Sequence, residues 1–243
     1  MNRSRRLTLE PAFLLHQRDF QESGRIIEFF TQDHGRVCLF ARGVRREKSV
    51  LSPVLQPFMP LLVSWAGSGD GGALTGAELA GAPVTLSADV LMSAFYLNEL
   101  LLKLLGREDP HPEIYSAYAA ALGDLAGGLS QARALRLFEK RLLEAIGVSL
   151  DYSQIAGSGE QLDPNEYYHV RSEQGVLGPV ARSSAGIHFQ GRELLSLASE
   201  ELTDESSLAA AKRVLRAALD QVLDGRTLST RDVARAIFDG RTK

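Results

Sequence analysis

The sequence is poor in cysteine and in long apolar runs. Cys38 is the only cysteine among the 243 residues, so the chain can form neither an intramolecular disulfide nor a cysteine-based zinc site. So little cysteine is typical of a protein in a reducing compartment. No segment approaches the roughly 20 consecutive apolar residues that span a bilayer, and the basic stretch 1–10 is not followed by an apolar one. We therefore expect a cytoplasmic protein with no membrane partner.

The sequence also lacks the motifs of common enzyme classes. Its five histidines form neither an HExxH nor an HxH pattern, which leaves a metal hydrolase without ligands. The stretch 67–72 is rich in glycine, but it lacks the Gly-Lys-Ser/Thr ending of a phosphate-binding loop and leads into a strand pattern, so it predicts a hairpin turn. A Gly-x-Ser-x-Gly nucleophile elbow is missing as well. A nuclease or phosphotransferase thus has no candidate residues, and we predict a protein that is not an enzyme and has no cofactor.

What the sequence does contain is typical of a folded globular chain. Hydrophobic residues make up 44% of it and charged residues 23%, which excludes a disordered or collagen-like chain. The net charge is −3, but residues 1–50 hold ten basic and six acidic side chains, a balance of +4, whereas the other 193 residues hold 17 basic and 24 acidic ones, a balance of −7. A basic end on an acidic body indicates a local site for a polyanion. A chance drift of charge over a solvated surface is the alternative.

Two kinds of periodicity divide the chain near residue 82. Residues 1–82 contain short strand-like runs separated by turn-forming residues, which predicts a small five-stranded β-barrel or sandwich. The runs are 11–16, 25–31, 36–41, 58–65 and 73–80. From residue 83 on, apolar residues recur with a helical period, so 83–243 is predicted to be an α-helical domain, and the fold class α+β. The expected helices are 87–105, 113–125, 130–146, 192–198, 205–223 and 230–238, with an irregular subdomain over 148–190.

The strongest functional signal is a basic cluster directly after the third predicted strand. Four basic side chains occur within seven positions there: Arg42, Arg45, Arg46 and Lys48. Gly43 gives the backbone freedom to turn, so the side chains can spread from a loop. Guanidinium groups pair with phosphate oxygens and also stack on bases, which favours single-stranded or irregular nucleic acid as the ligand. A solvated loop is the alternative.

Two weaker features accompany this cluster. The adjoining strands contain several aromatic residues, which we expect mostly in the core, and we assign none of them as a base-stacking surface. They are Phe13, Phe29, Phe30, Phe40 and Trp65. A second basic stripe, Arg133, Arg136 and Lys140, lies three and four residues apart on the predicted helix 130–146, off its apolar stripe. Such faces are most often only solvated, but this one could also receive an acidic peptide.

Short motifs along nearly the whole chain occur in the order and at the spacing of one known family. They are FLLH (13–16), ESGRII (22–27), GRV (35–37), ARGVRREKS (41–49), LQPF (55–58), YLNELLL (96–102), RLFE (136–139) and AGSGE (156–160). Together they resemble the RecO family of bacterial DNA repair proteins. The resemblance implies an N-terminal OB-fold over 1–82, followed by a helical domain.

The resemblance also implies a function. RecO-like proteins bind single- and double-stranded DNA, anneal complementary strands, and act with RecR to load the RecA recombinase onto DNA coated by single-stranded-DNA-binding protein. They also bind the acidic C-terminal tail of that coating protein. The resemblance therefore implies DNA contacts for Arg42, Arg45, Arg46 and Lys48, contacts with the acidic tail for Arg136, Arg133 and Lys140, and a place at the nucleoid. A protein-interaction adaptor whose DNA binding is incidental is the alternative.

In one respect the chain departs from the family pattern. Many RecO-like proteins carry a four-cysteine zinc site in the irregular segment, and the corresponding stretch here, 154–159, reads QIAGSG and contains no cysteine. We therefore expect no metal, and we expect packing and hydrogen bonds to hold this segment.

Overall fold

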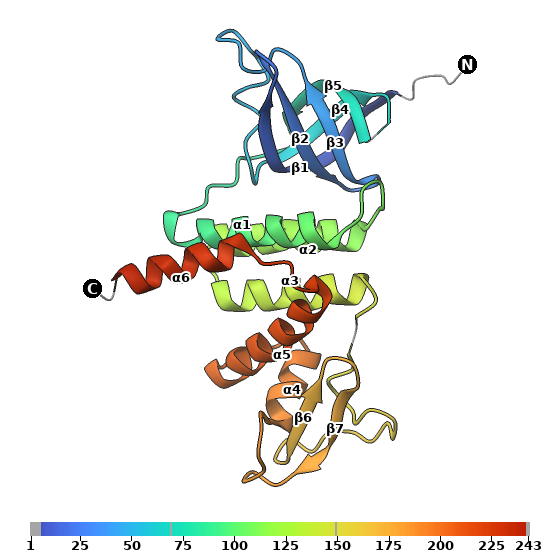
Figure 1. The fold of residues 1–243 in the computed structure, drawn as a ribbon, viewed down its shortest axis with the longest axis vertical. Coiled ribbons are helices and arrows are strands. Elements are labelled where there is room, and N and C mark those ends of the chain that lie inside the picture. Colours follow the sequence, from blue (N-terminus) through green and yellow to red (C-terminus); the bar gives the residue numbers. More distant parts are fainter. Residues whose placement is uncertain (1–5, 69, 149, 242–243) are drawn as a thin grey trace. The chain divides into compact units, whose positions relative to one another are not determined.

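The computed structural model describes residues 6–68, 70–148 and 150–241, which form two compact units (Figure 1). Unit 1 comprises residues 1–129 and 228–243, and unit 2 comprises residues 130–227. The boundary expected at residue 82 is where the barrel ends. The two helices that follow it in the chain pack with the barrel in unit 1. None of the helices in the described part of the chain is both long and apolar enough to cross a membrane.

Unit 1 contains a closed five-stranded barrel (Figure 1). Its strands are β1 (Arg6–Phe20), β2 (Gly24–Thr31), β3 (Gly35–Ala41), β4 (Pro60–Ala66) and β5 (Asp70–Leu79). They lie in the order β1-β2-β3-β5-β4, β4 pairs back with β1, and the contact between β3 and β5 is parallel whereas the other pairs are antiparallel. This is the arrangement of an OB-fold. The predicted five-stranded barrel and the α+β fold class are therefore confirmed.

Alternation along the strands fills the barrel. Ile27 and Phe29 of β2 and Leu39 of β3 have no solvent-exposed surface, while their neighbours on each strand point outward. The long connection between β3 and β4 contributes Val44 and Leu55 to the same core. The barrel core thus anchors this connection at two points.

Three helices complete unit 1: α1 (Ala88–Leu104), α2 (Pro112–Ala126) and α6 (Ser229–Arg241). Ser87 precedes α1 as expected. Phe13 of β1 contacts Tyr118 of α2 edge-to-face, with 5.0 Å between ring centroids. The side-chain amide of Asn98 in α1 donates to the carbonyl oxygen of Leu15 in β1 at 2.9 Å. One side of the barrel is therefore covered by α1 and α2.

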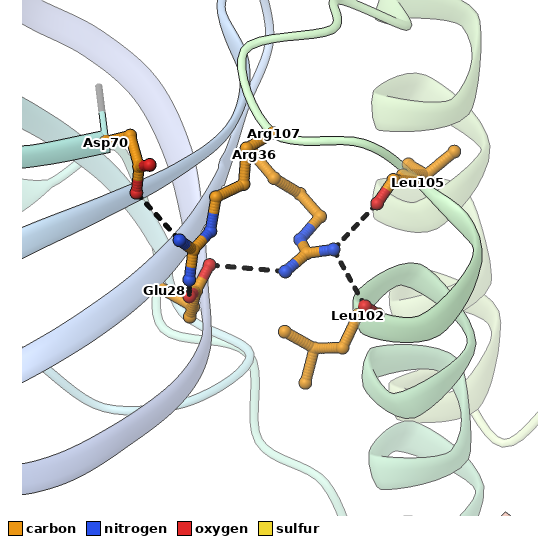
Figure 2. Close-up of polar contacts among 6 residues, drawn as sticks. All are labelled: Glu28, Arg36, Asp70, Leu102, Leu105 and Arg107. Carbon is orange, nitrogen blue, oxygen red and sulfur yellow. Dashed lines mark hydrogen bonds and ion pairs between the residues drawn. The ribbon is translucent and has the colours of Figure 1, made fainter. Parts of the chain in front are cut away.

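A buried guanidinium group joins the barrel to the C-terminus of α1 (Figure 2). Arg36 of β3 donates to the carbonyl oxygens of Leu102 and Leu105, each at 2.7 Å, and pairs with Glu28 of β2 at 3.3 Å. Arg107 pairs with the same Glu28 and, on its other side, with Asp70 of β5. The last carbonyl groups of a helix lack partners within the helix and carry partial negative charge, so a buried cation satisfies them.

A glutamate on α1 caps the start of α6. The carboxylate of Glu99 accepts hydrogen bonds from the backbone N–H of Ser229 at 2.8 Å, and from the N–H and hydroxyl of Thr230 at 2.9 and 2.6 Å. Partial burial alone would raise the pKa of Glu99, but these hydrogen bonds and the nearby ammonium group of Lys103 outweigh it and hold the pKa below its usual value. The ionised carboxylate thus stabilises the N-terminus of α6.

This cap is expected to weaken in acid. Because the pKa of Glu99 is lower in the folded than in the unfolded chain, its stabilisation is complete above the unfolded pKa and is lost as pH falls through the folded one. In Glu99→Gln, hydrogen exchange of the amides around Ser229 and Thr230 should be several-fold faster than in the wild type at pH 7, measured by mass spectrometry. The ratio of the two rates should fall toward one only as the pH drops below the usual pKa of a glutamate, about 4.3, and through the lower pKa of folded Glu99.

Glu78→Gln is the matched control, because Glu78 is an exposed glutamate of β5. It should leave exchange at Ser229 and Thr230 unchanged. Equal exchange in Glu99→Gln and wild type at pH 7 would show that Glu99 does not hold α6.

Unit 2 packs helices with a small antiparallel sheet of order β7-β6-β8. Its elements are α3 (Gln131–Ala145), β6 (Tyr167–Arg171), β7 (Gly175–Val180), β8 (Phe189–Gln190), α4 (Gly191–Ala198) and α5 (Glu205–Leu223). The hydroxyl of Ser130 accepts from the N–H of Arg133, and the carboxylate of Asp204 accepts from the N–H of Ser207, so side chains cap α3 and α5. The segment 148–190 was expected to be irregular, but it contains these short strands. Buried and exposed residues do not alternate regularly along β6 and β7, and β8 has only two residues, so no strand periodicity indicated them.

Candidate nucleic-acid interface

The loop after β3 has a defined backbone path. Gly43 adopts a φ of +65°, a left-handed conformation that glycine tolerates without strain. The N–H of Arg46 donates to the carbonyl oxygen of Gly43 at 3.1 Å, and the N–H of Arg45 donates to that of Ser23 at 3.1 Å, which ties the loop to the turn between β1 and β2. Val44 is fully buried in the barrel core. The backbone of this loop is therefore held in place, while the side chains of Arg42, Arg45 and Arg46 point into solvent.

The predicted basic residues of this loop, Arg42, Arg45, Arg46 and Lys48, are all exposed. Arg45 pairs with Asp19 at 3.4 Å, and Asp19 also pairs with Arg25 at 3.1 Å. Within the part of the chain that the structure describes, no acidic side chain forms an ion pair with Arg42, Arg46 or Lys48. Three of the four cations thus present unneutralised charge to solvent from a fixed loop, as an anion-binding surface requires.

Two phenylalanines and a pocket lie beside this loop. Phe20, at the end of β1, and Phe40, near the end of β3, contact each other edge-to-face with 5.4 Å between ring centroids. The guanidinium carbon of Arg42 lies 5.8 Å from the centroid of the Phe40 ring. The pocket has a volume of about 680 Å³ and is lined by Gln21, Glu22, Ser23, Gly24, Phe40, Arg42, Gly43 and Arg46.

Phe40 differs from the other aromatic residues that the sequence singled out in these strands. Phe13, Phe29, Phe30 and Trp65 are buried, as expected. Phe40 is only half-buried, because side chains alternate along β3 and its neighbours Leu39 and Ala41 occupy the core positions. Its ring therefore lies on the outer surface of the barrel. Phe20, which the sequence did not single out, is 37% exposed.

The second predicted set of basic residues lies on α3, where two of its members make contacts within unit 2. Arg133 donates to the backbone carbonyls of Glu201 at 2.9 Å and Glu200 at 2.8 Å. Lys140 pairs with the carboxylates of Glu144 at 2.9 Å and Glu200 at 3.1 Å. Burial alone would lower the pKa of Lys140, but the hydrogen bonds to the two carboxylates outweigh it and raise the pKa above its usual value. Lys140 therefore stays charged, and part of its charge is neutralised.

Arg136 is buried although its spacing places it off the apolar stripe of α3. Its side chain is 9% exposed and pairs with Glu139, which is 2% exposed, at 2.6 Å. The Nε atom of Arg136 has no hydrogen-bond partner among the described residues. Arg133, Arg136 and Lys140 thus do not form one solvent-facing stripe.

A pocket of about 800 Å³ in unit 2 includes one of these residues. Lys140 lines it together with Arg192, and the apolar side chains Leu150, Pro164 and Leu195 contribute to its wall. The acidic groups of the pocket are Glu144, Asp151 and Glu201. The pocket thus combines two cations with apolar surface, and its carboxylates reduce the positive charge.

Hydrogen bonds close the stretch 153–162, which contains no cysteine. The N–H of Ile155 donates to the carbonyl oxygen of Glu160 at 2.7 Å, and that of Leu162 to Ser153 at 3.0 Å. The hydroxyl and N–H of Ser153 both donate to the carboxylate of Asp151, which lowers the pKa of Asp151. In the ranges that the structure describes, no group of three or more His, Cys, Asp or Glu side chains is arranged to hold a metal ion. The residues at 154–159 thus do not fit the four-cysteine zinc site that the resemblance to RecO-like proteins suggests for this segment.

Cys38 lies on the outer face of β3 and is half-buried. Partial burial and the neighbouring carboxylate of Glu28 raise the pKa of the thiol. A thiol with a raised pKa is a weak nucleophile at neutral pH.

Two family models match nearly the whole chain. The model for the Recombination protein O N terminal matches residues 6–83, and the model for the Recombination protein O C terminal matches residues 87–231. The chain belongs to the RecO family. The resemblance predicted from the eight short motifs is thereby confirmed.

Similar RecO proteins come from several bacteria. The DNA repair protein RecO of Nitrosococcus oceani is 40% identical over 226 residues, which cover 93% of this chain and 92% of that protein. That of Methylococcus capsulatus is 41% identical over 231 residues, 95% of this chain and 94% of that protein. That of Actinobacillus pleuropneumoniae is 35% identical over 232 residues, 95% of this chain and 96% of that protein. These matches cover nearly the full length of the chain. The chain is therefore a DNA repair protein of the RecO family.

Proposed function

We propose that this RecO-family protein binds single- and double-stranded DNA through the loop 42–48, anneals complementary strands, and helps RecR to load RecA onto DNA coated by single-stranded-DNA-binding protein. The observation that carries the DNA-binding part is the fixed loop of the OB-fold with its exposed cations, Arg42, Arg46 and Lys48, none of which is neutralised by a described acidic side chain. Membership of the family supports the proposed roles of RecR and RecA.

Annealing needs no covalent chemistry on this account. Two complementary strands repel each other through their phosphates, and a cationic surface that neutralises part of this charge lowers the work of bringing them together. Guanidinium groups such as those of Arg42 and Arg46 suit this role, because each can bind two phosphate oxygens at once. Since bound strands remain exchangeable, the protein can release the duplex after pairing.

The acidic tail of the coating protein is proposed to bind unit 2 on the α3 side. Lys140 supports this, because it lines the pocket in which Arg192 and the apolar Leu195 also lie, and an acidic tail with apolar residues needs both kinds of contact. Arg136, with its unpartnered Nε atom, is proposed to join these contacts when the tail binds. Arg133 is proposed to act by holding the backbone at Glu200 and Glu201, to which it donates.

A strand-annealing assay tests the proposed function. Complementary oligonucleotides are coated with single-stranded-DNA-binding protein, and pairing is followed by fluorescence energy transfer. The wild type should accelerate pairing, and Arg45→Glu/Arg46→Glu should lose most of this acceleration, about tenfold or more in rate, because two cations of the loop become anions.

The matched control is Arg216→Glu/Arg235→Glu, which reverses two exposed arginines on helices α5 and α6. It should anneal at close to the wild-type rate. If folded wild type does not accelerate pairing, the annealing function is wrong and a protein-interaction adaptor becomes the better interpretation. Equal losses in both double variants would mean that overall charge, not the loop, is responsible.

A further inference from the structure

We propose that the pocket beside the loop 42–48 binds one unpaired base of single-stranded DNA, with Phe40, which lines the pocket, as the stacking surface and Phe20, which contacts Phe40 edge-to-face, as a second aromatic contact. This inference rests on the proposed DNA binding by the loop and goes beyond it, because it assigns contacts to bases in addition to phosphates. Nothing in the sequence pattern singled out Phe20, and Phe40 was grouped with core residues.

The first argument is the accessibility of these two rings on the outer surface of the barrel. Phe13 and Phe30 of the neighbouring strands are buried against Tyr118 and Tyr115 of α2. Phe20, in contrast, is 37% exposed, and Phe40 lines an open pocket. Partly exposed aromatic rings next to a basic loop are a common feature of surfaces that bind single strands.

The second argument is the geometry of the pair. The planes of the Phe20 and Phe40 rings lie at 84° to each other, with 5.4 Å between their centroids. A flat base that stacks on one of these rings meets the other ring nearly at a right angle. Both arrangements are favourable for aromatic rings, so the pair forms a corner for a base.

The third argument is that a glycine makes room for this corner. A Cβ atom on Gly24 would lie 2.5 Å from the Cε2 atom and 2.8 Å from the Cζ atom of Phe40. The Phe40 ring therefore packs directly on the backbone of β2, and any larger residue at position 24 would displace it. The ring is held in one position before a ligand binds, which reduces the entropy lost on binding.

The polar groups of the pocket fit the rest of a nucleotide. Arg42 and Arg46 line the pocket and can contact the phosphates on either side of the bound base, while the guanidinium group of Arg42 also lies over the Phe40 ring. Gln21 and Glu22 line it as well, and their side-chain oxygens can accept hydrogen bonds from N–H groups of a base. The carboxylate of Glu22 repels phosphate, so the backbone of the strand is expected on the arginine side.

This arrangement discriminates between single strands and duplexes. A base inside a duplex is already stacked on both faces, so the pocket cannot bind it without breaking a base pair. The loop contacts phosphates in both kinds of DNA, whereas the pocket contributes only to single strands. A strand that pairs with its complement leaves the pocket, which favours release of the annealed product.

Equilibrium binding by fluorescence anisotropy with three DNA probes tests the inference. The probes are an oligo(dT) strand, a strand of equal length with abasic sites in place of the bases, and a duplex. The wild type should bind oligo(dT) about tenfold more tightly than the abasic strand, since stacking of a single base has an effect of this size. Phe20→Leu/Phe40→Leu should lose this preference and keep its affinity for the abasic strand and for the duplex within about twofold.

Two further variants make the test specific. Phe95→Leu is the matched control, because Phe95 of α1 is also an exposed phenylalanine, at 38%, with an edge-to-face contact to another ring, that of Phe58. It should keep the preference for oligo(dT). Gly24→Ala keeps both aromatic rings but displaces the ring of Phe40. It should therefore lose the preference for oligo(dT), as Phe20→Leu/Phe40→Leu does. Circular dichroism checks that each variant is folded.

The outcomes separate this inference from the proposed function. If the wild type binds no DNA, the proposed function is wrong and the inference falls with it. If the wild type binds oligo(dT) and the abasic strand equally well, or if Phe20→Leu/Phe40→Leu retains the wild-type preference, the base pocket is wrong while DNA binding by the loop stands.

Discussion

Arg36→Ala is expected to lower the free energy of unfolding of unit 1 by about 3 kcal/mol. The Arg36 and Glu28 side chains are only 10% and 12% exposed, so the ion pair between them is largely removed from water. Removing one partner of a buried pair typically costs about 3–5 kcal/mol, because the other charge stays buried. The lower end applies here, since Arg107 remains beside Glu28 (Figure 2). The variant also deprives the carbonyl groups of Leu102 and Leu105 of their donor.

The measurement is urea unfolding followed by tryptophan fluorescence. Trp65 is the only tryptophan of the chain and is 1% exposed in the barrel core, so its emission reports on unit 1. Arg107→Ala is the control: its side chain is 43% exposed, and its removal should cost less than about 1 kcal/mol. If Arg36→Ala costs no more than Arg107→Ala, the buried guanidinium group does not hold α1 on the barrel.

The elements that could be predicted from the sequence are those with a strong local signal. Strand β4 alternates between buried and partly exposed residues along all seven of its positions, and the helices α1 and α3 begin directly after serines at 87 and 130. The basic loop was found because its four cations are close together in the sequence and follow a strand. Each of these signals lies within one stretch of about ten residues, where spacing and composition are directly informative.

The contacts that could not be predicted depend on which elements pack together. In the sequence, Arg36 is one basic residue in a strand, and only the approach of α1 makes it a buried partner of two helix carbonyls. Arg136 has the spacing of a surface residue, yet it is buried beside Glu139. Phe20 and Phe40 lie twenty residues apart and meet only because β1, β2 and β3 are neighbours in the barrel. The candidate base pocket therefore had no signal in the sequence.

The second large effect is expected in the salt dependence of DNA binding. Each phosphate that the protein neutralises contributes about −0.7 to the slope of log affinity against log salt concentration for single strands, and about −0.9 for duplexes. Arg42→Gln/Arg46→Gln removes two cations, so the slope should become less steep by about 1.4 for single strands and about 1.8 for duplexes. Arg45→Gln alone should change the slope less than Arg42→Gln alone or Arg46→Gln alone, because Arg45 already pairs with Asp19.

Binding measured between about 50 and 200 mM salt distinguishes phosphate contacts from base contacts. Arg216→Gln/Arg235→Gln serves as the control and should leave the slope unchanged, and an unchanged slope in Arg42→Gln/Arg46→Gln would show that the loop does not contact phosphates. Phe20→Leu/Phe40→Leu should lower the affinity for single strands by the same factor at every salt concentration, because stacking releases no counterions. A change in slope thus identifies the arginines as the phosphate-binding groups, and a parallel shift identifies the two phenylalanines as the base-binding ones.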